Sequence, residues 1–241
     1  EITTRLVGSE MCIRDSFGMM GWKSGNRYTY AEGSPVTNLF MNLKYLIARD
    51  NIYMNTYDLT EVYGVGNVKL LQNNHYLPMG FMTNSALASW QVDENEDQFN
   101  PFDKQNEFFK LVTGIKDDVY TPLDVVSQGH TDYNQFPVNK TGYGRYSFSC
   151  TDTTVTPHVK WNYEAPKDGL YLMYADISGG DDVTVMINDV AQSKTYGMGR
   201  SYIACIGQCK KGDKISVYSN LQQGQSGSAM VFVDVLNQDV F

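Results

Sequence analysis

Three histidines, His75, His130 and His158, are the side chains of this sequence best suited to proton transfer near neutral pH. They fall in separate segments, which favours surface or partly buried imidazoles over a general base or a metal ligand. No GxSxG, HExxH, Walker or EF-hand pattern accompanies them. We therefore predict no catalytic residue in this chain.

Cysteines are the next candidates, and Cys150, Cys205 and Cys209 are those outside residues 1–16. The stretch CIGQC lacks the two-residue gap of zinc knuckles and thioredoxin-like sites, so we predict no metal ligand among them. Two alternatives stay open. In an extracytoplasmic setting Cys150 could form a disulfide with Cys205 or Cys209. Otherwise all three are small buried hydrophobic side chains, which the residues favour.

Two loops contain residue types found in ion and phosphate sites. The stretch DISGGDD, Asp176–Asp182, offers oxygen ligands of the kind that calcium takes, yet a solvated hairpin loop explains it better. Gly142 and Gly144 in KTGYGRY match a phosphate-binding loop only in part, because no helical pattern follows them. We interpret these glycines as flexible loop positions and predict no metal site.

Aromatic residues are abundant, with 17 Tyr, 11 Phe and 3 Trp. An exposed Tyr or Trp ring can stack on a sugar, because it combines an apolar body with a polar edge. The same rings fill the cores of β-sandwiches, and core packing is favoured for any single one. The segments that could present an aromatic face contain Trp22, Tyr28, Tyr30, Tyr143, Tyr146, Trp161 and Tyr163. Our candidate sugar contacts among these are Trp22, Tyr28, Tyr143, Trp161 and Tyr163.

The charge balance excludes one class of partner. The chain has 19 basic and 27 acidic residues and a formal net charge of −8. Nucleic-acid binding needs clustered Lys and Arg, so we predict no nucleic-acid partner. The same balance disfavours an anionic membrane surface for the chain as a whole.

The elements that must position these residues are mostly strands, and the predicted fold class is mostly β (α+β). Residues 17–115 read as a small mixed segment with short strands and one helix at about 100–113, capped by Asn100 and Pro101 and ended by Gly114. Residues 116–241 alternate polar and apolar between frequent turns, which predicts an antiparallel β-sandwich or jelly-roll-like domain. The last strand runs almost to Phe241, so we expect the chain's end to truncate this domain.

The opening segment 1–16, EITTRLVGSEMCIRDS, has no apolar run and no signal-peptide pattern. Its string TRLVGSEMCIRDS resembles translated sequencing-adapter read-through. We therefore expect residues 1–16 to be a non-native scar and set them aside.

Three segments together resemble one family. They are LKYLIARD (Leu43–Asp50), VYGVGNVKLLQNNHYLPMGFM (Val62–Met82) and NPFDKQNEFFKLVTG (Asn100–Gly114), in this order. The order is similar to that of the YfhO family of bacterial membrane proteins, and APKDGLYLMYA, VMIND and IGQCKKGDKISV resemble its downstream sandwich. The motif residues are Lys44, Tyr45, Leu77, Pro78, Gly80, Phe81, Asn100, Pro101, Gln105 and Asn106.

This resemblance implies a multi-span membrane glycosyltransferase that uses an isoprenoid-phosphate sugar donor and acts on cell-envelope polymers. Its catalytic acidic residue would lie in a loop upstream of Phe17. The chain would then be the C-terminal extracytoplasmic portion, at the outer face of the bacterial cytoplasmic membrane, with no cofactor of its own. Its expected partners are its own upstream membrane spans and a cell-envelope glycopolymer, which it would orient as acceptor.

Three alternatives remain, each from a different functional class of protein. One is a secreted carbohydrate-binding module without a membrane partner. Another is a purely structural ectodomain that packs on the membrane part or on a second copy, whose signature would be a large exposed apolar patch. A free-standing hydrolase is the third, and the lack of a nucleophile or metal constellation disfavours it.

Overall fold

The structure is a computed structural model that describes residues 22–24, 27–29, 34–49, 59–78, 80–90, 99–130, 136–151, 154, 157–180, 182–196 and 203–241. It divides into two compact units. The first comprises Glu1–Tyr120, Tyr202–Gly207 and Asn237–Phe241, and the second comprises Thr121–Ser201 and Gln208–Leu236.

The last residues of the chain belong to the first unit, whereas the sequence analysis placed all of 116–241 in the sandwich. The backbone N–H of Asn237 donates to the carbonyl of Val119 at 2.8 Å. The Phe241 ring lies 6.4 Å from the Phe109 ring, centroid to centroid. These contacts join segments far apart in sequence, which local patterns do not reveal.

The first unit contains two α-helices, a short 3-10 helix and two small sheets within the described residues. Its elements are β1 (Trp22–Ser24), β2 (Arg27–Thr29), α2 (Pro35–Phe40), β3 (Tyr45–Arg49), β4 (Leu59–Val65), β5 (Val68–Asn73), η1 (Ser85–Ser89) and α3 (Pro101–Thr113). Strands β1 and β2 pair antiparallel, and β3, β5 and β4 form a second antiparallel sheet in that order.

Helix α3 has the bounds and caps that the sequence predicts. The Asn100 side chain accepts from the N–H of Phe102 at 3.0 Å, and Pro101 occupies the first turn. Gly114 adopts φ 77° and its N–H donates to the carbonyl of Lys110, which closes the helix. The buried face includes Phe109, as its spacing indicates.

Helix α2 is a feature that the sequence analysis missed. Ser34 caps it by accepting from the N–H of Thr37 at 3.2 Å, and Pro35 opens its first turn. The apolar run from Leu39 to Ala48 is therefore not one element. Asn42, at φ 54°, separates the helix from strand β3.

The second unit is a two-sheet antiparallel sandwich. Its strands are β7 (Ser127–His130), β8 (Val138–Gly142), β9 (Arg145–Ser149), β10 (His158–Glu164), β11 (Gly169–Ile177), β12 (Val183–Ile187), β13 (Val190–Tyr196), β15 (Lys214–Asn220) and β16 (Ser226–Leu236), with β6 (Tyr120–Pro122) and β14 (Ala204–Cys209) at sheet positions beside them. The sheet orders are β13-β12-β15-β10-β7 and β14-β11-β16-β9-β8, and β6 also pairs with β16.

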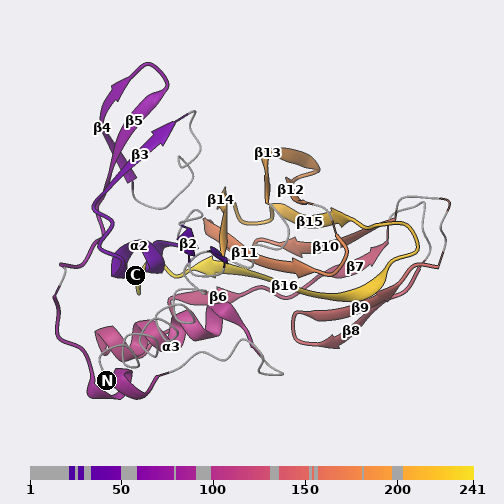
Figure 1. The fold of residues 1–241 in the computed structure, drawn as a ribbon, viewed down its shortest axis with the longest axis horizontal. Coiled ribbons are helices and arrows are strands. Elements are labelled where there is room, and N and C mark those ends of the chain that lie inside the picture. Colours follow the sequence, from indigo (N-terminus) through magenta and orange to yellow (C-terminus); the bar gives the residue numbers. More distant parts are fainter. Residues whose placement is uncertain are drawn as a thin grey trace. The chain divides into compact units, whose positions relative to one another are not determined.

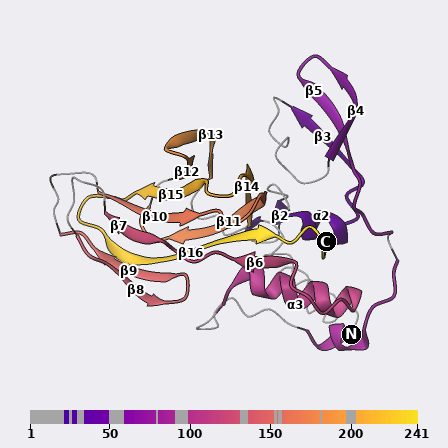
Figure 2. The same cartoon turned by 180° about the vertical axis from the view of Figure 1, so that it is seen from behind.

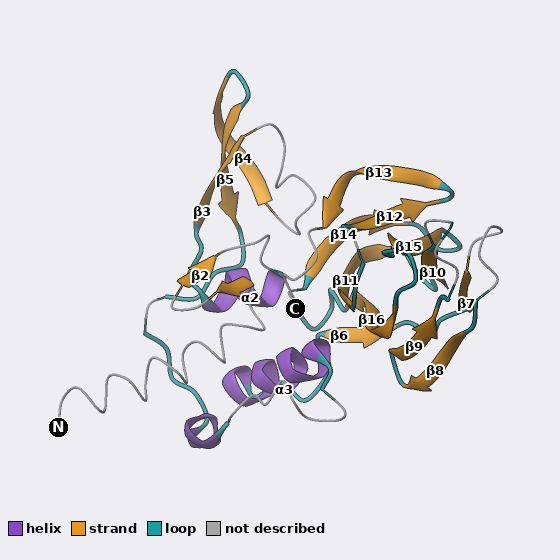
Figure 3. Cartoon of the chain, turned by 45° about the vertical axis from the view of Figure 1, so that its right-hand side comes forward, coloured by secondary structure: helices purple, strands orange, loops and turns teal. Residues whose placement is uncertain are grey.

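Aromatic side chains connect the two sheets of the sandwich, which Figure 3 shows as two layers of strands. The Tyr146 ring of β9 lies 5.3 Å from the Trp161 ring of β10, centroid to centroid. The Tyr163 hydroxyl donates across to the carbonyl of Val231 at 3.5 Å. The predicted fold class, mostly β with an antiparallel sandwich, is confirmed.

Candidate functional site

Trp161 and Tyr163 are core residues, so the prediction that they contact sugar is wrong. Their side chains are 0% and 2% exposed. They alternate along β10 with Lys160 and Asn162, which take the other face, so the strand period itself directs the rings inward. The side chains of Trp22 and Tyr28, and all of Tyr30, lie outside the described residues.

Tyr143 is the sugar-contact candidate that the structure leaves accessible, with 46% of its surface exposed. It lies in the turn between β8 and β9. Its ring centroid is 5.9 Å from that of Phe232, which in turn lies 6.3 Å from the ring of Tyr174. Tyr143 is thus an exposed ring supported from beneath by buried aromatic side chains.

Gly144 packs closely against Phe232 and so holds the turn that contains Tyr143. The interpretation of Gly144 as a flexible loop position is therefore wrong. Its φ is 62°, and an added Cβ would overlap the Phe232 ring. The N–H of Val231 also donates to the Gly144 carbonyl at 2.8 Å. The position therefore needs a residue without a Cβ, and the turn is held against β16.

Two buried tyrosines of the sandwich, Tyr146 and Tyr163, keep their phenolic protons near neutral pH. Burial raises the pKa of Tyr146 to about 12. Burial, with the nearby Tyr146, Tyr143 and Asp234, raises the pKa of Tyr163 well above its ordinary value. Both phenols therefore stay neutral near neutral pH. Both rings pack in the core, and of the two hydroxyls only that of Tyr163 donates a hydrogen bond within the described residues, to Val231.

The motif residues of α3 join the helix to two other segments of the first unit. Gln105 accepts a hydrogen bond from the hydroxyl of Ser34, the α2 cap, at 2.9 Å. The Asn106 side chain makes a pair of bonds to the backbone of Tyr120: its Nδ2 donates to the carbonyl at 2.9 Å, and its Oδ1 accepts from the N–H at 2.8 Å. Both amides are buried, so their role is structural.

The other motif residues have mixed surroundings. The Lys44 ammonium lies 5.5 Å from the ring centroid of Tyr45 and 5.0 Å from that of Tyr76. In the LPMGF stretch the N–H of Leu77 donates to the Leu39 carbonyl, and the Phe81 ring lies 6.1 Å from that of Phe40. Pro78 follows Leu77 in this stretch. The space around Gly80 is open, so packing does not require a glycine there.

Three turns of the sandwich, from the stretches PKDG, IND and KKGD, are bonded to one another. Asp168 accepts from the Lys210 ammonium at 2.9 Å and from the N–H of Lys211 at 2.8 Å. Asp213 accepts from the Asn188 side chain at 2.8 Å and from the N–H of Lys210 at 2.7 Å. These bonds lower the pKa of both carboxyls, and they stabilise one end of the sandwich.

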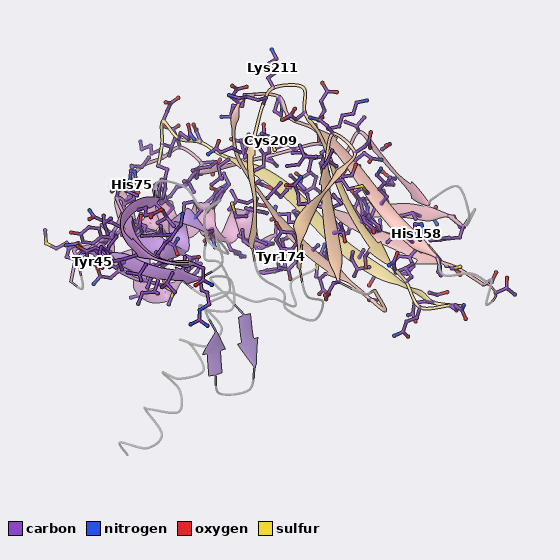
Figure 4. All side chains as sticks on the ribbon, turned by 90° about the horizontal axis from the view of Figure 1, so that it is seen from above. Tyr45, His75, His158, Tyr174, Cys209 and Lys211 are labelled. Carbon is purple, nitrogen blue, oxygen red and sulfur yellow. The ribbon has the colours of Figure 1, made fainter. Side chains whose placement is uncertain are left out.

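The three cysteines that the structure describes are buried thiols, and none forms a disulfide with another. The structure therefore agrees with the second alternative, that these cysteines are small buried side chains, and not with a disulfide from Cys150 to Cys205 or Cys209. Burial, together with the charge of Asp213, raises the pKa of Cys209 to about 12. Its thiolate is therefore disfavoured near neutral pH, which argues against a nucleophile at this position. Cys209 and Lys211 are both labelled in Figure 4.

The acidic loop after β11 shows no ion site in its described part. Asp182 is exposed, and Asp176 is half-buried with its pKa raised by that burial. Among the described residues of the chain, no group of three or more His, Cys, Asp and Glu side chains is placed to hold a metal ion.

The sheet of β3, β5 and β4 has an exposed apolar face that the sequence analysis did not identify. The three strands lie side by side in both views (Figure 1, Figure 2). Pairing places Ile47, Leu70 and Tyr63 in one row across the strands, and Arg49, Val68 and Val65 in the next. We define the outer face by nine residues on this side of the sheet, all exposed or partly exposed: Tyr45, Ile47, Arg49, Thr60, Tyr63, Val65, Val68, Leu70 and Gln72.

The opposite face of this sheet contains buried apolar side chains. Leu46, Ala48 and Leu71 form a small buried cluster, with Leu59 packed against it. The stretch YLIAR alternates between the two faces, with Tyr45 and Ile47 outside. The available signal was that both faces of this strand are apolar, since a strand with one solvated face normally alternates with polar residues.

Solved structures with a likeness to part of the chain include two carbohydrate binding modules. A family 35 carbohydrate binding module from Clostridium thermocellum has 14% identity and a TM-score of 0.31, and the match covers 48% of this chain and 96% of that one. The CBM36-1 domain of a multidomain xylanase from the hindgut metagenome of Trinervitermes trinervoides has 10% identity and a TM-score of 0.29, covering 48% and 95%.

A larger enzyme also shows this likeness. The catalytic unit of the GH87 alpha-1,3-glucanase from Streptomyces thermodiastaticus strain HF3-3 has 8% identity and a TM-score of 0.28, and the match covers 48% of this chain and 27% of that one. No curated protein sequence matches the chain significantly.

The family comparison covers almost the whole sequence. The model of the family described as bacterial membrane protein YfhO matches residues 9–239, a range that begins inside the segment 1–16. Among the described residues, no helix is long and apolar enough to cross a membrane. The order of motif segments and this match agree, and the chain belongs to the YfhO family of bacterial membrane proteins.

Proposed function

We propose that this chain is the extracytoplasmic domain of a YfhO-family glycosyltransferase and that it orients a cell-envelope glycopolymer as acceptor. The parent protein would use an isoprenoid-phosphate sugar donor, bound by its membrane-embedded part. The chain itself supplies neither a catalytic residue nor a cofactor in this proposal. Family membership supports the link to a membrane protein, and it favours this function over that of a secreted module.

The observation that carries the acceptor role is the supported ring of Tyr143. Its side chain is partly exposed and of a type that stacks on a pyranose, and the packing of Gly144 against Phe232 limits how far the turn can move. A preorganised ring loses little conformational entropy on binding. Weak, repeated contacts of this kind suit a polymer that must slide past a membrane-embedded active site.

The test compares two exposed tyrosines. Tyr143→Ala should weaken binding of the purified chain to a wall teichoic or lipoteichoic polymer by about tenfold. Tyr63→Ala removes an exposed tyrosine of the outer face and should leave polymer binding unchanged. Isothermal titration calorimetry measures both. The acceptor proposal fails if the unmodified chain binds no such polymer, or if the two variants bind equally well.

A second candidate function, the structural ectodomain, is favoured by the outer face of the three-stranded sheet. An exposed apolar patch was the expected signature of that function, and Ile47 at 74% exposure lies within such a patch. The two functions use different residues, so one chain can serve both.

A further inference from the structure

The outer face combines apolar side chains with positive charge. Ile47, Tyr63 and Val65 are all largely exposed, although Ile and Val side chains are usually buried. Arg49 is the last residue of β3 and lies in the same cross-strand row as Val65. The Lys44 ammonium lies over the ring of Tyr45 at the edge of the face. Among the described residues of the outer face there is no carboxylate.

The one described acidic residue of these strands, Glu61, lies on the opposite face of the sheet. Glu61 pairs with Leu71, which lies on the buried side of the sheet. Its carboxylate forms an ion pair with Lys69 at 2.9 Å, and Lys69 pairs with Ala48 on that same side. Among the described residues of the three strands, no carboxylate therefore lies on the outer face to offset its positive charge.

We propose that the outer face of the β3–β5–β4 sheet docks onto the headgroup region of an anionic lipid bilayer. The chain belongs to a family of membrane proteins, so a bilayer is close at hand. Tyrosine rings favour the interface between water and hydrocarbon, and Arg and Lys are attracted by anionic headgroups. Aromatic and cationic side chains also occur together at protein interfaces. The positive charge of the face and the membrane-protein family of the chain are what favour an anionic bilayer as the occupant.

The sheet geometry limits how deeply the face can enter. The sheet is open, with β3 and β4 at its edges. An open strand edge cannot enter the hydrocarbon core, because its backbone groups would lose their hydrogen bonds to water. Contact at headgroup depth keeps the edges hydrated while Ile47 and Tyr63 leave the water.

The net charge of −8 disfavours binding of the chain as a whole to an anionic surface, but electrostatic repulsion acts only over short distances. At physiological ionic strength charges are screened beyond about 8 Å. The charges that touch the headgroups then decide the interaction. These are Arg49 on the outer face and Lys44 at its edge, beside Tyr45.

The inference does not depend on glycopolymer binding, and vesicles test it separately. The probes are vesicles of phosphatidylglycerol and phosphatidylcholine in equal parts, and vesicles of phosphatidylcholine alone. We expect the purified 241-residue chain to cosediment with the first and only weakly with the second. Tyr143→Ala should leave this binding unchanged.

A matched pair of valines supplies the control. Val65 and Val190 are 64% and 65% exposed, and each adjoins the two-residue turn of a hairpin. Val65→Asp should weaken vesicle binding at least tenfold, since it removes apolar contact and adds a repelled charge. Val190→Asp changes the net charge equally and should alter binding less than about twofold.

Two further variants separate the apolar and the electrostatic parts. Ile47→Asp should also weaken binding at least tenfold, with circular dichroism unchanged because the side chain is exposed. Arg49→Gln should weaken binding to the anionic vesicles by about fivefold and have no effect on phosphatidylcholine vesicles. In about 0.5 M salt the effect of Arg49→Gln should largely disappear, whereas that of Ile47→Asp should persist in part because this variant also loses apolar contact.

Several results would overturn the inference. The unmodified chain could fail to bind the anionic vesicles, or Val190→Asp could weaken binding as much as Val65→Asp does. Sedimentation could instead show a dimer that Ile47→Asp dissociates, with no vesicle binding, in which case a second copy of the chain covers the face. Loss of polymer binding alone would leave the lipid inference standing.

Discussion

The sandwich and the three-stranded sheet use their apolar residues in opposite ways. In β11 the first six residues are all buried, so this strand is covered on both faces. In β3 the burial alternates, and the exposed positions hold Tyr45 and Ile47. Apolar side chains in the sandwich stabilise the fold, whereas those of the outer face remain available for a partner.

The size of each core explains this difference. Within the described residues, the three-stranded sheet buries a cluster of Leu46, Ala48 and Leu71, which is small for a sheet near the lower limit of independent stability. The sandwich contains large buried rings such as Trp161, Tyr146 and Tyr163. A sheet that exposes apolar residues despite so small a core is better explained by binding than by folding.

The largest expected effect separates a core residue from an outer-face residue. Trp161→Ala should lower the free energy of unfolding by about 3–5 kcal/mol, because it leaves a large cavity between the sheets. Ile47→Ala should change it by no more than about 0.5 kcal/mol, since the side chain is exposed. Urea unfolding followed by circular dichroism measures both, and a comparable loss in the two variants would contradict the distinction.

A pair of hairpin glycines sharpens the comparison. Gly66 in the β4–β5 turn and Gly144 in the β8–β9 turn both have φ near +60°, so alanine strains the backbone at either position. Only Gly144 also contacts a ring, that of Phe232, whereas the space around Gly66 is open. Gly144→Ala should cost about 2–4 kcal/mol and Gly66→Ala about 1–2 kcal/mol.

The same urea titration distinguishes the two glycine variants. Adding Phe232→Leu to Gly144→Ala should recover part of the lost stability, because the smaller side chain makes room for the new methyl group. Equal losses for Gly66→Ala and Gly144→Ala, with no recovery from Phe232→Leu, would show that the turn strain alone matters.

Local signals predicted local structure well. Asn100, Pro101 and Gly114 marked both ends of α3, and the structure confirms the helix. Helix α2 had a comparable signal in Ser34 and Pro35, but its six residues were hidden by the apolar run that continues into β3. A helix this short is stabilised by the contact of Ser34 with Gln105, which no local pattern reveals.

The candidate site was predictable only in part. Period-two alternation could have assigned Trp161 and Tyr163 to the core, since Lys160 and Asn162 lie between and beside them. Exposure of Tyr143 depends on Phe232, 89 residues later in the sequence, and was not readable locally. The outer face depends likewise on the pairing of three strands, because a row such as Ile47, Leu70 and Tyr63 exists only in the folded sheet.

The smallest expected effect concerns pH and belongs to the turns of the sandwich. Hydrogen bonds from Lys211 and Lys210 lower the pKa of Asp168, and those from Asn188 and Lys210 lower that of Asp213. A carboxyl with a lowered pKa in the folded state stabilises the fold above its unfolded pKa of about 4. That contribution is lost as pH falls through the lowered folded pKa.

Asp168→Asn combined with Asp213→Asn should therefore reduce the loss of sandwich stability between about pH 5 and pH 2. Asp176→Asn is the control of opposite sign, because burial raises the pKa of Asp176 and its ionisation opposes folding as pH rises. Removing that group should make the decline toward acid steeper. Thermal unfolding at a series of pH values measures all three curves. If the double variant follows the unmodified chain throughout, the bonded turns do not contribute to the acid stability of the sandwich.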